Sequence, residues 1–361
     1  MIVPQIDREL GMLNYMSESE PVSGKLREKL SDFIVDEVLS GKRASRAFLG
    51  KERFEGSGFH YYVVLKYERI EDRELIRRVS RALGGRVGFA GVKDARSVSF
   101  QFISSNRRAD MELRLRGAVI KWVGKGEWIS SGLNDGNHFS IVVRGVEELE
   151  TIRRFPNFFS YQRFGVRKPY NHEVGRALVK REIEEACDLL AKQGYDASET
   201  RSLKQLSERI GKELLRFYIH SYQSYLFNLL LSERLEHGLS PEEGDFVLKP
   251  GGEISIYPDE GELLLPVIGA FTRTKGGWLE ERLKSLLRDE GLTREAFIFR
   301  ELPEISSLGD FRKAVCEALS LKSKRGRGFV AFTFFLESGS YATSYLREII
   351  KPRDPVSQGF I

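Results

Sequence analysis

The segment best suited to chemistry is a glycine turn that presents a lysine and an aspartate side by side. Residues 88–94 read Gly-Phe-Ala-Gly-Val-Lys-Asp, so an expected strand runs into a turn that ends in Lys93 and Asp94. A carboxylate in a loop opened by glycine can reach a substrate that approaches the backbone closely. From the spacing alone, a turn with two solvated charges is the favoured interpretation. The segment is not a phosphate-binding P-loop, because the GxxxxGK(S/T) pattern is absent.

Residues 136–143 combine an amide with an aromatic ring at the start of an apolar run. Asn137 offers an amide that can hydrogen-bond a base edge, and Phe139 offers a ring that can stack on the base. The same pattern is ordinary for a turn followed by a strand, and on pattern alone Phe139 is predicted to lie in the core.

Residues 156–165, Pro-Asn-Phe-Phe-Ser-Tyr-Gln-Arg-Phe-Gly, interleave aromatic and polar side chains. Phe159 supplies a plane for stacking, and Arg163 supplies positive charge for phosphates, with Arg167 and Lys168 following. These are the properties that an RNA-binding surface needs. The alternative is an interdomain linker with half-buried aromatics.

Two further segments can bind anions. Residues 339–348, Gly-Ser-Tyr-Ala-Thr-Ser-Tyr-Leu-Arg-Glu, predict a loop that leads into a helix, whose free N–H groups attract negative charge. The alternative is a helix capped by Ser340 or Thr343. Residues 322–328, Lys-Ser-Lys-Arg-Gly-Arg-Gly, predict a basic turn before the last strand, either solvated or in contact with phosphates.

Length and composition bound the kind of protein that carries these segments. The chain has 361 residues, enough for two or three domains, and 41% of them are hydrophobic. Its formal charge of +5 permits an anionic partner without requiring one. The two distant cysteines and the scattered histidines predict neither a disulfide scaffold nor a zinc site. Because no signal-peptide core and no run of ~20 apolar residues is found, we expect a soluble cytoplasmic protein.

The periodicity of the chain predicts an α+β protein with a helical middle. Strands are predicted around residues 32–38, 61–67, 87–90, 100–104, 119–123, 139–143 and 326–336, and helices over 71–83, 147–155, 212–237 and 342–350. Because helical periodicity dominates residues 173–235 between two α+β ends, the pattern suggests one domain inserted in another.

Six segments, in the same order along the chain, resemble the motifs of tRNA pseudouridine synthase D, the TruD family. Together the matches span about residues 27–350. The six are residues 32–37 (DFIVDE), 90–94 (AGVKD, with Gln101 downstream), 136–139 (GNHF), 156–165 (PNFFSYQRFG), 222–228 (YQSYLFN) and 339–348 (GSYATSYLRE).

The resemblance implies an α+β pseudouridine synthase fold. A catalytic domain with an antiparallel sheet would comprise residues 1–155 and 306–361, split by an inserted, largely helical TruD-specific domain of residues 156–305. The implied reaction converts uridine to pseudouridine in tRNA, typically at position 13, with no cofactor and no metal. tRNA is the expected partner, no membrane is involved, and the chain is assumed to be a monomer.

The resemblance also assigns roles to residues. Asp94 falls on the catalytic aspartate of the family, although Ala95 stands where a basic residue often follows it. The residues expected to bind the substrate are Phe33, Asn137 and Tyr341, which fall on positions that line the uridine pocket, Arg27, which falls where many members have Lys, and Lys93, Phe139, Phe159 and Arg163.

The implied reaction breaks the C1′–N1 bond, turns the uracil and joins C1′ to C5. Asp94 would act either as a nucleophile at C1′ or as a base for a sugar proton. A nearby cation, Arg27 or Lys93, would keep the pKa of Asp94 low. Phe33 and Tyr341 would hold the freed base once the uridine has left its stack.

Three alternatives compete with this interpretation. A non-catalytic RNA-binding protein on the same scaffold is opposed by the intact Asp94. A purely structural tRNA chaperone would be distinguished by a turnover assay. A glycoside hydrolase or nucleosidase usually needs a second, paired carboxylate, and no such pair stands out near Asp94.

Overall fold

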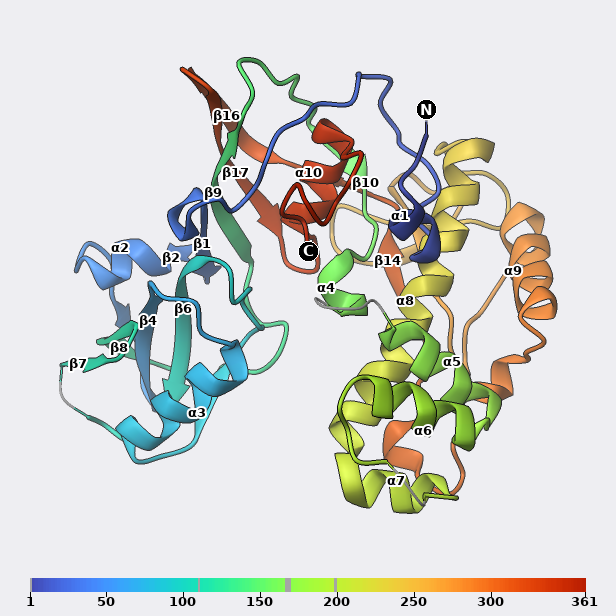
Figure 1. Cartoon of the computed structure of the whole chain (residues 1–361), viewed down its shortest axis with the longest axis horizontal. Coiled ribbons are helices and arrows are strands. Elements are labelled where there is room, and N and C mark those ends of the chain that lie inside the picture. Colours follow the sequence, from blue (N-terminus) through green and yellow to red (C-terminus); the bar gives the residue numbers. More distant parts are fainter. Residues whose placement is uncertain (1, 110, 166–169, 198–199) are drawn as a thin grey trace.

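The last strands of the chain complete a sheet that its first half begins (Figure 1). The computed structural model describes residues 2–109, 111–165, 170–197 and 200–361. This sheet is formed by β1 (Phe33–Leu39), β2 (Lys42–Arg43), β3 (Phe54–Glu55), β4 (Phe59–Lys66), β5 (Val87–Phe89), β6 (Val98–Ser105), β7 (Glu112–Leu115), β8 (Ala118–Gly126), β9 (Gly136–Arg144), β16 (Leu319–Gly326) and β17 (Phe329–Glu337). The main path runs β16-β17-β9-β1-β6-β4-β8-β3.

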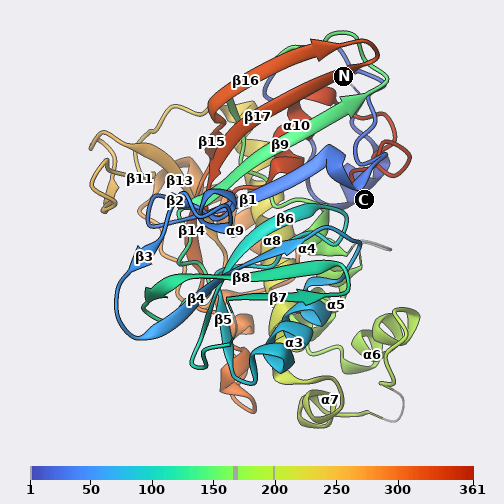
Figure 2. The ribbon, with the colours of Figure 1, turned by 90° about the vertical axis from the view of Figure 1, so that its left-hand side faces the viewer.

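Strand β9 joins the two halves of this sheet. It pairs antiparallel with β1 on one side and with β17 on the other, and Figure 2 shows β16, β17 and β9 side by side. This register sets Asn137 opposite Glu37 and Phe139 opposite Phe334. The β1–β6 and β3–β8 pairs are parallel, and the other pairs described in this sheet are antiparallel. The predicted α+β class is confirmed.

Two helices cover opposite faces of the β4–β6–β8 region because side chains alternate along a strand. Helix α3 (Asp72–Leu83) packs its apolar face with Tyr62 and Ile103. Helix α2 (Ala44–Phe48) packs with Tyr61 and Phe102 on the other face. The predicted end of α3 is confirmed, since Gly84 has a φ of +63° that closes the helix.

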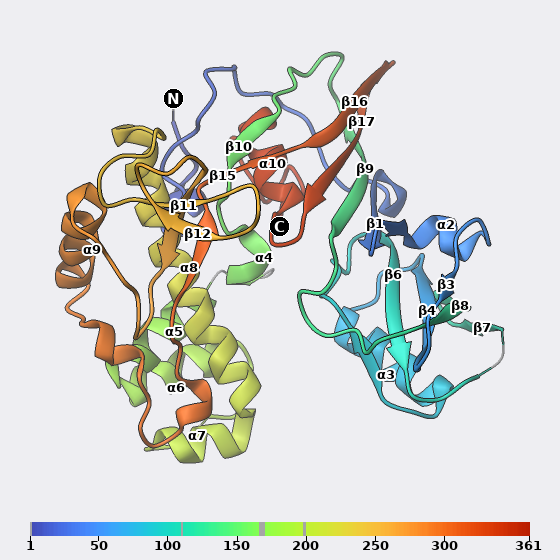
Figure 3. The same cartoon turned by 180° about the vertical axis from the view of Figure 1, so that it is seen from behind.

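The middle of the chain forms a helical unit around α8 (Lys212–His237), the predicted long helix. Figure 3 shows α5 (Asn171–Lys180), α6 (Ile183–Lys192) and α7 (Leu203–Ile210) gathered near one end of α8. The other elements of this region are α4 (Tyr161–Phe164), α9 (Gly277–Asp289), the short 3-10 helices Arg294–Phe297 and Pro303–Ile305, and a sheet of order β12-β11-β13-β14 made of β11 (Phe246–Leu248), β12 (Ile254–Ile256), β13 (Glu262–Val267) and β14 (Asp310–Lys313).

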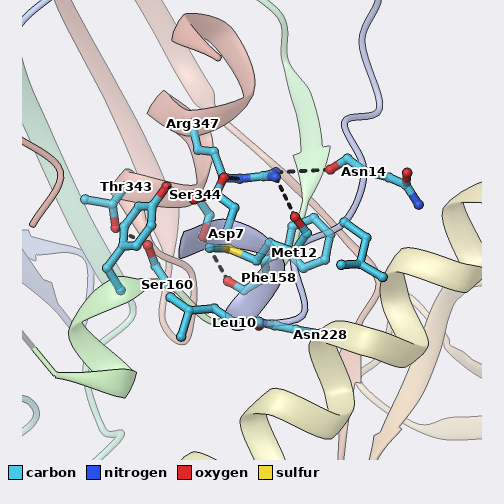
Figure 4. A network of polar contacts seen from close by, with 12 residues as sticks. Asp7, Leu10, Met12, Asn14, Phe158, Ser160, Asn228, Thr343, Ser344 and Arg347 are labelled. Atoms are coloured by element: carbon cyan, nitrogen blue, oxygen red, sulfur yellow. Dashed lines mark hydrogen bonds and ion pairs between the residues drawn. The ribbon is translucent and has the colours of Figure 1, made fainter. Parts of the chain in front are cut away.

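The N-terminal segment ties this helical unit to the end of the chain (Figure 4). It contains α1 (Gln5–Glu9), and a 3-10 helix over Leu30–Asp32 follows before β1. Arg347 of α10 (Ala342–Ile350) lies with its Nε 2.5 Å from Asp7 Oδ2 and donates to the Met12 carbonyl at 2.9 Å. Asn228 of α8 donates to the Leu10 carbonyl at 2.9 Å. One buried network therefore links α1, α8 and α10.

Two predictions of local structure are wrong. Residues 147–153 form no helix, and residues 154–156 form β10 (Arg154–Pro156), which pairs with β15 (Val315–Glu317). Residues 322–326 are not a turn but part of β16, which pairs with β17. The partner of β10 is distant in sequence, whereas β16 pairs with the next strand, β17, across a turn at residues 327–328. In both places strand pairing overrides the local pattern. The basic side chains of residues 322–326 therefore lie on a strand at the edge of the large sheet.

In the part of the chain that is described, none of the helices has both the length and the apolar character needed to cross a membrane.

Candidate active site

Both carboxylate oxygens of Asp94 are held by groups from other positions in the chain. Asp94 lies in the loop between β5 and β6. Arg27 Nη2 lies 2.6 Å from Asp94 Oδ2, and the main-chain N–H of Arg96 donates to Oδ1 at 2.8 Å. The Asp94 side chain keeps 22% of its surface exposed, whereas that of Arg27 keeps 3%. A partly exposed carboxylate is therefore neutralised by a buried cation.

Arg27 contacts two of the predicted site residues at once. Its guanidinium carbon lies 4.2 Å from the centre of the Phe33 ring, and its Nη1 donates to the Gly359 carbonyl at 2.7 Å. Its backbone has a φ of +57°, a left-handed conformation that costs a non-glycine residue about 1 kcal/mol. The side-chain contacts hold Arg27 in this conformation and bring Asp94 and Phe33 to one guanidinium group.

The pKa of Asp94 is lowered despite its surroundings. Burial alone would raise this pKa, because the charged carboxylate loses hydration. The charge of Arg27 and the N–H of Arg96 outweigh burial, with further help from the charge of Lys66 and a hydrogen bond from the Gln162 side chain. Asp94 is therefore ionised at neutral pH, which both a nucleophile and a base require.

Lys66, at the end of β4, holds the backbone of the same loop. Its Nζ donates to the Asp94 carbonyl oxygen, which also accepts the Ser97 hydroxyl at 2.8 Å. Asp72, at the start of α3, is buried, and burial raises its pKa to about 6 although the Lys93 N–H and the charge of Lys66 oppose the rise. The sequence analysis missed Lys66 and Asp72, because neither lies in a segment that carries a recognisable chemical pattern.

Lys93 faces away from the carboxylate beside which it lies in sequence. Its Nζ lies 2.5 Å from Glu37 Oε1 and 3.1 Å from Asn137 Oδ1. Glu37 Oε2 accepts the main-chain N–H of Phe102 at 2.8 Å. Of the two cations considered for Asp94, Arg27 is therefore the one that pairs with it, while Lys93 and Asn137 belong to a buried network that joins β1 and β9 to the loop.

Gln162 of α4 is a second contact that the sequence analysis did not single out. It lines a small pocket with Arg27, Asp94 and Tyr161, and its side chain hydrogen-bonds the Asp94 carboxylate. Thr343 Oγ1 lies 3.0 Å from Gln162 Oε1. An amide oxygen can only accept, so this contact turns the Gln162 NH₂ group toward Asp94. The segments 156–165 and 339–348 thus meet at the carboxylate.

Contacts between aromatic rings divide the remaining predicted residues into two groups. Phe33 is 3% exposed and packs edge-on against Phe139 at 6.2 Å, so both rings are largely core. Tyr341 lies instead beside Phe159, with ring centres 6.1 Å apart, and Arg163 lies over Phe159 at 5.3 Å. Two more predicted contributors to RNA binding, Arg167 and Lys168, lie outside the described residues.

The arrangement centres on the Asp94 carboxylate. Among the described residues, the groups that shift the pKa of Asp94 are Arg27, Arg96, Lys66 and Gln162, and none of them is a carboxylate. In the same part of the chain, no three His, Cys, Asp or Glu side chains gather as they would to bind a metal ion. One ionised carboxylate, fixed by an arginine and a glutamine, remains.

Comparisons with known proteins agree on one family. The family model for tRNA pseudouridine synthase D (TruD) matches residues 9–209 and 193–349. Proteins named "Probable tRNA pseudouridine synthase D" from Pyrobaculum neutrophilum and Thermococcus sibiricus are 31% and 30% identical, over 99% and 93% of this chain and 99% and 97% of theirs. A structure titled "Crystal Structure of the Putative tRNA pseudouridine synthase D (TruD) from Methanosarcina mazei" is 24% identical and has a TM-score of 0.70, covering 97% of this chain and 99% of its own. That structure and this chain share a fold.

Proposed function

Because this chain belongs to the tRNA pseudouridine synthase D (TruD) family, we propose that Asp94 is the carboxylate with which it isomerises uridine in tRNA to pseudouridine. The observation that carries this assignment is the ionised, partly exposed Asp94 side chain, paired at 2.6 Å with the buried Arg27. We further propose position 13 of tRNA as the target.

The reaction is an isomerisation, so substrate and product contain the same atoms. The C1′–N1 bond breaks, the uracil turns, and a C1′–C5 bond forms, after which C5 loses a proton and N1 gains one. Asp94 either attacks C1′ or removes a ribose proton, and both routes need the charged form that Arg27 maintains. We expect no cofactor and no metal ion to be required.

The other predicted residues either contact the uracil, hold the loop that carries Asp94, or bind the RNA beside the target uridine. Phe33 is buried and supports Arg27. Tyr341, the half-buried residue just before α10, meets the uracil. Asn137 and Lys93 fix the loop from behind through Glu37, and Phe139 packs behind Phe33. Phe159 and Arg163 contact the RNA strand beside the target uridine.

We propose a two-domain division close to the one expected from the sequence. Residues 1–155 would form the catalytic domain with the end of the chain, whose strands β16 and β17 complete the large sheet. The inserted domain would begin at 156 and extend to Lys313, because β14 pairs with β13 and not with the large sheet.

Incubation of the purified protein with an unmodified tRNA transcript tests the function directly, with pseudouridine scored by mass analysis at each position. We expect pseudouridine at position 13 and none in a transcript with cytidine there. Asp94→Asn keeps the shape of the side chain but removes its charge, so it should bind tRNA without converting it. Normal turnover by this variant would disprove the assignment, and binding without turnover by the unaltered protein would favour an RNA chaperone.

A further inference from the structure

A cavity lies beside α4, and one of its lining residues directly follows, in sequence, the residue that contacts Asp94. Gln162 hydrogen-bonds that carboxylate, and the next residue, Arg163, lines the cavity together with Arg312 of β14 and Phe159. The cavity has a volume of about 570 Å³, within the range of sites that hold small organic ligands. It is thus large enough for one nucleotide.

Arg312 is bound by neutral acceptors. Its Nε donates to the Asn157 carbonyl at 3.0 Å, its Nη2 to Asn157 Oδ1 at 2.5 Å, and its Nη1 to the Gly339 carbonyl at 2.7 Å. These bonds use three of the five N–H groups of a guanidinium. Burial lowers the pKa of Arg312, and the charge of Arg163 lowers it further. Among the described residues, no carboxylate forms an ion pair with Arg312.

Arg163 adds a second charge, and no carboxylate in the described part of the chain forms an ion pair with it. Its guanidinium carbon lies 5.3 Å from the Phe159 ring centre, and its Nε is buried without a hydrogen-bond partner. The acidic residues of the cavity do not compensate: Glu337 pairs with Lys313 at 2.9 Å, and the exposed Asp310 accepts the N–H of Phe311. The two guanidinium groups are close enough to repel each other, and neither forms an ion pair with a carboxylate among the residues that are described. Such a pair of charges favours the binding of an anion from solution.

We propose that this cavity binds one unstacked nucleotide of the substrate RNA, a neighbour of the target uridine, with its phosphate between Arg163 and Arg312. This inference rests on the proposed function, because the nucleotide belongs to the strand whose uridine reaches Asp94. Guanidinium groups suit phosphate because their planar N–H groups can bind two oxygens at once. His220 also lines the cavity, and burial together with Arg163 and Arg216 lowers its pKa to about 4. Its neutral ring can therefore hydrogen-bond a base edge.

Single methylphosphonate substitutions test the contact, because each removes the charge of one phosphate. The probe is a tRNA fragment that contains the target uridine, substituted at one flanking phosphate at a time and bound to the inactive Asp94→Asn protein. One position should weaken binding about 10-fold, as expected for loss of a charged hydrogen bond. The same substitution should cost clearly less when Arg163→Gln is added, since the phosphate has then already lost one of its two partners.

Arg288→Gln, on the exposed surface of α9, is the matched control and should leave the penalty intact at that position. Thermal unfolding of each variant verifies that it is folded. If the Arg163→Gln and methylphosphonate effects add independently at every position, the proposal is overturned. Failure of the proposed function gives a different result, in which the unaltered protein does not isomerise the unsubstituted tRNA.

Discussion

The ammonium group of Lys66 donates a hydrogen bond to the main-chain carbonyl of Asp94, so a buried lysine holds the backbone of the residue whose side chain Arg27 holds. Burial lowers the pKa of Lys66, against the opposing charges of Asp72, Asp94 and Glu71. Lys66 thus contacts the main chain of Asp94 and Arg27 contacts its side chain, and the effect of each cation can be tested separately.

Lys66→Met removes the donor while keeping an unbranched side chain of similar length. We expect the single-turnover rate at saturating tRNA to fall at least ~10-fold, since displacement of a catalytic group by ~1 Å can cost ~100-fold. The affinity for tRNA should change much less, because Lys66 is fully buried. Lys125→Met, at an exposed position on β8, is the control. A rate equal to that of the control would rule out this positioning role.

Asp72→Asn should make the protein more stable at neutral pH. In the native state burial raises the pKa of Asp72 from 3.8 to about 6. At a pH between these two pKa values, Asp72 is ionised in the unfolded chain but still protonated in the native chain. The contribution of Asp72 to stability is therefore fully present below pH 3.8 and is lost as the pH rises from there through about 6. The loss amounts to about 3 kcal/mol at most, from 1.36 kcal/mol per pKa unit.

Urea unfolding of Asp72→Asn and the parent protein, at pH values on either side of this window, checks the prediction. The difference in unfolding free energy between the two proteins should grow as the pH rises. The same difference at both pH values would show that burial does not shift the pKa of Asp72.

Arg27→Gln should shift the acidic limb of the pH–rate profile to higher pH. Burial tends to raise the pKa of Asp94, and the charge of Arg27 is the strongest influence that lowers it. Without this charge the Asp94 carboxylate keeps its proton up to a higher pH. Activity therefore begins at a higher pH when the pH is raised from acidic values. Arg27→Lys retains the charge and should shift the limb less. An acidic limb that is identical in the parent and in Arg27→Gln would contradict the assignment.

The basic edge strand β16 presents charges on two faces, because side chains alternate along a strand. Lys322 and Lys324 lie on one face, and Arg325 lies on the other, where it pairs with Glu148. If the lysine face binds phosphates, Lys322→Ala with Lys324→Ala should flatten the slope of log K against log salt by roughly 0.7 to 0.9 for each phosphate that is no longer neutralised. Arg325→Ala is the control, and an unchanged slope in the double variant would leave this edge without a role in tRNA binding.

Arg347→Met should destabilise the whole chain. The side chains of Arg347 and Asp7 keep 1% and 0% of their surfaces exposed, so the substitution leaves a buried carboxylate without its partner (Figure 4). A loss of about 3–5 kcal/mol is expected in urea unfolding. Adding Asp7→Asn should restore part of this stability because it removes the orphaned charge. A double variant no more stable than Arg347→Met would show that packing, and not charge, accounts for the loss.

Some elements follow from the sequence alone, because near neighbours set their pattern. Helices α3 and α8 follow from apolar spacing and from glycines at or just beyond their ends, and β4 follows from a run of aromatic and β-branched residues. The position of Asp94 in a loop after a strand follows for the same reason. These features depend on steric preferences and side-chain periodicity over a few residues, which are visible in any short stretch of chain.

Which of these side chains meet depends on the tertiary structure. Lys93 is next to Asp94 in sequence yet pairs with Glu37, while Arg27, 67 residues away, forms the ion pair. Gln162 reaches the same carboxylate because α4 is fixed from α10 through Thr343. The predicted helix over 147–155 was wrong because strand pairing near its end replaced the local preference. Contacts of this kind depend on how distant segments pack, and the free energy that selects them appears only when the whole core is assembled.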